Sequence, residues 1–146
     1  MKTKQVTARE VKSTTQQRDE EKIRELRDQI GSRIGQHNLA AASEAYLELM
    51  RLDSGQVLPR QYLLDIANQL ASDNQHSEAA GAYEQFLAHY STYEYAEQVE
   101  LMLGILYSRY LNRPELAVKH LRAAVEKLSD PNQLKMCRDE LARLES

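Results

Sequence analysis

Residues 103–124 read LGILYSRYLNRPELAVKHLRAA, and most of the architecture can be inferred from this stretch because the chain uses its pattern three times. Ala117 is followed by Leu121 four residues later and by Ala124 three residues after that. The same order of a small, a large and an apolar residue occurs twice earlier, at Ala42, Tyr46, Leu49 and at Ala79, Tyr83, Phe86. The alanines are 37 (79 − 42) and 38 (117 − 79) residues apart, which is close to the periods of helix-pair repeats.

Small residues at these positions have a packing explanation. An alanine early in the second helix of a pair lets that helix approach the first one closely, and the larger residue one turn later fills the remaining space. The pattern therefore predicts three helix pairs that stack on one another.

The rest of the chain also has the period of an α-helix. Only 5 Gly and 3 Pro occur in 146 residues, which favours long helices over the turn-rich pattern of an all-β protein. Apolar residues recur every three or four positions in seven segments, namely 23–34, 39–50, 63–70, 79–87, 99–107, 117–128 and 134–144. This spacing predicts about seven helices, the last of which caps the stack.

Local signals predict where four of these helices begin. Asn38 can cap the second helix, and Asp130 followed by Pro131 can cap the seventh. Two further pairs have the three-residue spacing of a capping box and predict the starts of the fifth and sixth helices: Ser91 with Glu94, and Asn112 with Glu115.

The N-terminal part of the chain differs in composition. Residues 1–19 are mostly polar, with Val6 and Val11 almost alone as apolar side chains, so burial cannot offset the entropy of ordering them. We expect a flexible polar lead-in over 1–19 and one helical-repeat domain over 20–146.

The repeat resembles the tetratricopeptide repeat (TPR) family. The resemblance is clearest where Leu103 and Gly104 are followed by Tyr107 and then by the alanine pattern, and it covers three repeats up to about Ser129, with the seventh helix as the cap. The spacing is longer than the family's period of about 34 residues, and Ser54, Ser91 and Ser129 stand where the family has a closing proline. More distantly, the second and third repeats resemble the soluble tails of some bacterial rhomboid-type membrane proteins.

The resemblance implies a right-handed solenoid whose concave face, lined by the first helix of each pair, binds a peptide or a partner helix. Leu64, Leu101 and Ile105 lie off the predicted core stripes and would form an apolar strip if exposed; the alternative is that they pack against the lead-in or a self-association interface. The positions of this sequence that match the concave face are Arg24, Arg27, Gln61, Leu64, Asn68, Gln98, Leu101, Ile105 and Ser108.

Three tyrosines and the single cysteine are expected to have structural roles. Tyr90, Tyr93 and Tyr95 crowd the junction between the fourth and fifth helices, where a tyrosine usually buries its ring and leaves its hydroxyl in water; a binding hot spot is the alternative. The single Cys137 cannot build a disulfide framework, and we interpret it as a small buried hydrophobe.

Charge and motifs argue against several classes of function. A formal net charge of −3 gives no positive field for nucleic acid. The four histidines lack the helical-turn spacing of a metal site, and the sequence contains neither a glycine-rich phosphate loop nor an activated nucleophile. We therefore expect no cofactor, no small-molecule substrate and no catalysis.

The sequence as a whole predicts a non-catalytic protein–protein interaction module, an adaptor or scaffold for a protein or peptide. The alternative is a self-associating (homo-oligomeric) or membrane-tethered accessory domain of a larger membrane protein, with the tether outside this chain. The expected location is the cytoplasm, or the cytoplasmic face of a membrane under that alternative.

Overall fold

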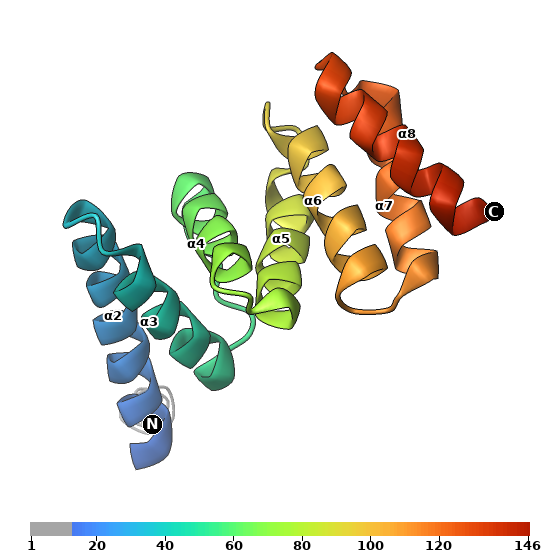
Figure 1. Cartoon of the computed structure of the whole chain (residues 1–146). Helices are drawn as coiled ribbons and strands as arrows, with labels where there is room; N and C mark the ends of the chain where they lie inside the picture. The colour runs from blue at the N-terminus through green and yellow to red at the C-terminus, as the bar shows by residue number, and fades with distance from the viewer. Residues whose placement is uncertain (1–12) are drawn as a thin grey trace, which may run out of the picture. The chain divides into compact units, whose positions relative to one another are not determined.

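The computed structural model describes residues 13–146, and over this range it contains seven α-helices and no strand (Figure 1). The helices are α2 (Thr14–Gly35), α3 (Leu39–Leu52), α4 (Arg60–Ser72), α5 (His76–Tyr90), α6 (Ala96–Arg109), α7 (Pro114–Lys127) and α8 (Pro131–Glu145). Among these residues no helix combines the length and apolar character that crossing a bilayer requires.

The helices belong to two compact units. The first unit ends at Gln56 and contains the pair α2 and α3, and the second unit runs from Val57 to Ser146 and contains α4 to α8. Helices that are neighbours in sequence pack against each other: α2 on α3 in the first unit, and α4 on α5, α5 on α6, α6 on α7 and α7 on α8 in the second. The predicted all-α helical repeat is therefore confirmed.

Helix α2 begins earlier than the sequence predicted. Ser13 and Gln16 form a capping box, in which the Ser13 hydroxyl accepts from the Gln16 N–H at 3.0 Å and the Gln16 side chain accepts from the Ser13 N–H at 2.9 Å. This pair satisfies two N–H groups that would otherwise lack partners. The expected lead-in therefore does not extend to residue 19, and its residues 1–12 lie outside the described part of the chain.

Two of the four predicted caps are present. The side chain of Asn38 accepts from the Ala41 N–H at 3.1 Å, and that of Asp130 accepts from the Gln133 N–H at 2.9 Å. The other two predictions are wrong, because Ser91 and Asn112 belong to the preceding turns, and α6 and α7 begin without a side-chain cap.

A shared turn geometry explains how each helix pair reverses direction. Past the end of the first helix of each pair, one residue has a positive φ: His37 at 59°, Asn74 at 61° and Asn112 at 50°. These residues are 37 (74 − 37) and 38 (112 − 74) positions apart, the same intervals that separate the alanines. A left-handed residue at this point ends a helix by redirecting the backbone, so the repeat is present in the backbone as well as in the side chains.

The alanine pattern forms the core, as predicted. Ala42, Ala79 and Ala117 are fully buried. The larger residues one turn later and the apolar residues after them are also buried: Tyr46, Tyr83, Leu121, Leu49, Phe86 and Ala124.

Helix α6 makes a tight contact with α7 at Gly104. A Cβ atom at this position would overlap with the Cγ and Cδ2 atoms of Leu121 in α7. Gly104 is therefore required by packing, because only a residue without a side chain lets the two helices meet here.

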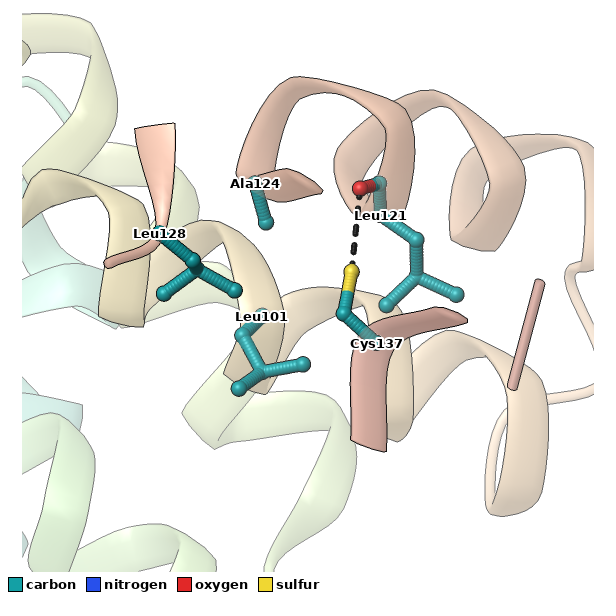
Figure 2. Packing of buried hydrophobic residues seen from close by; sticks show 5 residues of the cluster. All are labelled: Leu101, Leu121, Ala124, Leu128 and Cys137. Carbon is teal, nitrogen blue, oxygen red and sulfur yellow. Dashed lines mark hydrogen bonds between the residues drawn. The ribbon is translucent and has the colours of Figure 1, made fainter. Parts of the chain in front are cut away.

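Helix α8 covers α6 and α7 with its apolar side. Figure 2 shows Cys137 of α8 between Leu101 of α6 and Leu121 of α7, within a buried cluster that also contains Ala124 and Leu128. The Cys137 thiol donates to the backbone carbonyl of Leu121 at 3.1 Å, and burial raises the pKa of this thiol. The prediction that Cys137 is a small buried hydrophobe is confirmed.

Candidate functional site

The nine predicted concave-face residues divide between the two units. Arg24 and Arg27 belong to α2 in the first unit, where Arg24 is exposed. Arg27 is half-buried, and its Nη1 donates to Oε1 of Gln56 at 3.2 Å. The other seven residues belong to α4 and α6 in the second unit.

The predicted apolar strip is not exposed. Leu64 and Leu101 retain only 8% and 5% of their accessible surface, and Ile105 packs against the buried cluster under α8. The expectation of an open strip along α6 is therefore wrong. The physical reason is that α8 packs its apolar residues against the face of α6 that was expected to be free. These residues are Leu134, Cys137, Leu141 and Leu144.

Ser108 also contacts α8. Its hydroxyl donates to Glu140, a buried carboxylate that further accepts from Arg109 at 2.9 Å and from Arg143. Burial by itself raises the pKa of Glu140, but the hydrogen bonds from Arg143, Arg109 and Ser108 outweigh it and lower the pKa to about 2. These hydrogen bonds link the C-terminal half of α8 to the end of α6.

The remaining predicted residues meet in one pocket. Gln61, Leu64 and Asn68 of α4 face Gln98 of α6 across a cavity of about 320 Å³. This volume is at the lower end of the range of about 300–1,000 Å³ that is common for ligand pockets. The other lining residues are Tyr83, Tyr95, Val99 and Met102.

The pocket is apolar with amides around it. Leu64, Tyr83 and Val99 are buried, whereas Tyr95 and Met102 are 45% and 37% exposed. Burial raises the pKa of Tyr83 to about 12, so this residue stays a neutral phenol. Its hydroxyl donates to Oδ1 of Asn68, an exposed residue of α4.

Gln98 has an incomplete set of hydrogen bonds. Its Nε2 donates to Oε1 of Gln133 in α8 at 3.4 Å, a long hydrogen bond, while its Oε1 is buried and has no partner. A buried acceptor without a donor destabilises a protein by about 1–3 kcal/mol. Gln98 thus lines the pocket with a side chain whose oxygen is itself enclosed by protein.

None of the eight residues that line this pocket carries a charge. One lining residue contacts a carboxylate, because Nε2 of Gln61 donates to Asp65 at 2.9 Å. A neutral, largely apolar wall favours an uncharged occupant, because an ion buried there would lose its hydration without gaining a counter-charge.

The tyrosines between α5 and α6 form an aromatic group. Tyr93 packs against Phe86 and Tyr95, and the Arg60 guanidinium lies 4.2 Å from the centre of its ring. The hydroxyl of Tyr90 donates to the carbonyl of Leu58 at 2.7 Å. Tyr95 lines the pocket described above.

The sequence analysis missed a cluster of ionisable side chains around the buried His120 of α7. Nδ1 of His120 lies 2.5 Å from Glu100 of α6, and Nε2 lies 2.9 Å from Glu84 of α5. The imidazole stacks on Tyr107, and burial together with the Glu84 carboxylate raises the pKa of that tyrosine. Because Glu100 and Glu84 are 20 (120 − 100) and 36 (120 − 84) positions from His120, no local spacing could reveal that this side chain contacts two other helices.

Comparison with known proteins does not assign this chain to a family. No family model matches the chain, and no curated protein matches it either. Within residues 13–146, no three His, Cys, Asp or Glu side chains are grouped so that they could hold a metal ion. The class that the fold defines is an all-α helical-repeat protein.

Proposed function

We propose that this protein is a non-catalytic interaction module that binds an uncharged, partly apolar peptide segment in the pocket between α4 and α6. The observation that carries the proposal is the meeting of Gln61, Leu64, Asn68 and Gln98 at one cavity. The exposed amides of Gln61 and Asn68 offer hydrogen-bonding groups at the cavity, and its apolar lining offers a place for a peptide side chain.

The exposed edges of the pocket support this function. Tyr95 and Met102 are large side chains that remain partly in water, whereas Leu64, Tyr83 and Val99 of the same pocket are buried. Such side chains are common where a partner covers them, because aromatic residues and methionine contribute area and adapt to the surface that they contact.

We further propose that the chain belongs to the TPR-like group of helical repeats. The alanine pattern, the left-handed turn residues at the same intervals and the glycine at the helix contact all support it. On this view the first helices of the second and third pairs supply the binding residues, as the resemblance implies.

A selection experiment tests the proposed function. The whole chain is immobilised and used to select binders from a random peptide library, and the affinities of the selected peptides are measured by calorimetry. We expect peptides with micromolar affinity whose binding is weakened at least about tenfold by Met102→Glu, which places a carboxylate at the pocket edge.

Met136→Glu is the matched control. Met136 is a 52% exposed methionine on α8 that does not line the pocket, so this variant should bind the same peptides with unchanged affinity. Failure to select any peptide, or equal loss of binding in both variants, would contradict the assignment of this pocket as the binding site.

A further inference from the structure

We infer that Met102 is an oxidation-sensitive site, at which a hydroperoxide converts the thioether to a sulfoxide and thereby weakens peptide binding in the pocket between α4 and α6. This inference rests on the proposed function and deepens it by naming a regulation of the same pocket. It starts from a 37% exposed methionine in the wall of an otherwise largely apolar and uncharged cavity.

The sulfur-containing side chains of this protein differ in their access to solvent. Met102 and Met136 are 37% and 52% exposed, whereas Met50 is half-buried and Cys137 is fully buried. The fourth methionine, Met1, lies outside the described residues. Because a dissolved oxidant must reach the sulfur that it oxidises, we expect Met102 and Met136 to react before Met50.

Cys137 does not compete for the oxidant. A cysteine reacts with peroxides as its thiolate, and burial raises the pKa of Cys137, which keeps the thiol protonated. The thiol also donates to the carbonyl of Leu121 at 3.1 Å inside the cluster under α8. The reaction with a hydroperoxide is therefore expected at the exposed thioethers.

The reaction with hydrogen peroxide needs no group from the protein other than the thioether. A lone pair of the sulfur attacks one peroxide oxygen, so that an S–O bond forms as the O–O bond breaks. The hydroxide that leaves takes the proton of the transferred OH group, and the products are the sulfoxide and water. The sulfur loses two electrons and the peroxide gains them, which converts a flexible apolar side chain into a polar one.

Of the two exposed methionines, only Met102 lines the pocket. It shares the wall with the buried side chains of Leu64, Tyr83 and Val99. A sulfoxide oxygen is an acceptor that water satisfies, and an apolar peptide side chain that covers it would displace this water without supplying a donor. Oxidation of Met102 should therefore weaken binding, whereas oxidation of Met136 should not.

The experiment uses the whole chain and peptides selected with the untreated protein. The protein is treated with hydrogen peroxide, the residual peroxide is removed with catalase, and the oxidised residues are identified by peptide mass mapping. Calorimetry then measures the affinity for a peptide that was never in contact with peroxide. We expect protein that carries the sulfoxide at Met102 to bind about tenfold more weakly and to keep its circular dichroism spectrum.

Two variants and a repair step assign the effect to one residue. Met136→Leu lacks the exposed thioether outside the pocket, so it should bind like the unmodified protein and lose the same affinity after treatment. Met102→Leu has no sulfur in the pocket, so treatment should not change the affinity that this variant has before it. Methionine sulfoxide reductases for both epimers, with dithiothreitol as the reductant, should restore binding by the oxidised unmodified protein.

The outcomes separate this inference from the proposed function. If no peptide is selected, the proposed function fails and the inference fails with it. If peptides bind, the inference alone is overturned when Met102 stays unoxidised while Met136 reacts, when the sulfoxide at Met102 leaves the affinity unchanged, or when treatment weakens binding by Met102→Leu equally. If Met102→Leu does not bind the peptides at all, the repair step decides, because a loss that the reductases do not reverse comes from another lesion and overturns the inference.

Discussion

Gly104 is the single residue whose replacement should have the clearest structural effect. Gly104→Ala adds a Cβ that overlaps with Leu121, and overpacking of this kind typically destabilises a protein by about 1–3 kcal/mol. We expect a corresponding drop in the free energy of unfolding in urea. Leu121→Val in the same chain should recover part of the loss by making room.

Gly81 provides the control within the neighbouring helix. It lies in the middle of α5, and a Cβ there would meet no atom within 4 Å. Since glycine lowers helix stability by about 1 kcal/mol relative to alanine, Gly81→Ala should stabilise the protein. If both substitutions stabilise the protein, the expected overlap between a Cβ at position 104 and Leu121 is contradicted.

Among the helices, α8 depends on the buried carboxylate of Glu140. The pKa of Glu140 is about 2 in the folded protein, against an ordinary value of 4.5. Because the folded pKa is lowered, the stabilisation is complete above about pH 4.5 and is lost as the pH falls towards 2. The difference corresponds to roughly 3 kcal/mol at neutral pH.

Glu140→Gln should therefore lower the free energy of unfolding at pH 7 by an amount of this order and make little difference near pH 2. Denaturant titrations of both proteins across this range measure the effect. The matched control is Asp139→Asn, at the residue next to Glu140. It removes an exposed ion pair in which Asp139 lies 2.7 Å from Lys135, and it should change stability little. An equal loss in both variants, or a Glu140→Gln effect independent of pH, would argue against this role of the network.

The helices themselves were largely predictable, because helix formation and the alanine pattern depend on residues three or four positions apart. The caps at Asn38 and Asp130 were predictable for the same reason. The predictions at Ser91 and Asn112 failed because a turn can use the same polar residues: Asn112 adopts a positive φ, which asparagine tolerates better than most residues do.

The candidate site was only partly predictable. Gln61, Leu64, Asn68 and Gln98 were selected from the repeat, and the structure brings them together. The burial of Leu101 and Ile105 was missed, because it depends on where α8 docks, and that contact links residues more than 25 positions apart. The unpaired atom of Gln98 could not be foreseen, since it results from the geometry of three helices.

For the whole chain, the division at Gln56 and Val57 predicts an autonomous second unit. Residues 57–146 contain four sequential helix contacts, the cluster under α8 and the complete pocket. We expect this fragment, produced alone, to unfold cooperatively and to bind the peptides selected with the whole chain with similar affinity. Circular dichroism and calorimetry measure both properties, and a fragment without a cooperative transition would contradict the division.

The alternative of self-association or membrane tethering stays a prediction at this level. Sedimentation of the whole chain over a range of concentrations measures the first part, and a chain that is monomeric throughout would argue against it. Peptide binding by such a monomer would leave the interaction module as the simpler assignment.

A pocket without charged walls has a kinetic consequence. Long-range electrostatic steering accelerates the encounter of charged partners and weakens as ionic strength rises, but a neutral cavity has no such attraction to lose. Binding of a selected peptide should therefore keep nearly the same rate constant of association between about 50 mM and about 500 mM salt. A ligand of this protein would then be found by undirected diffusion.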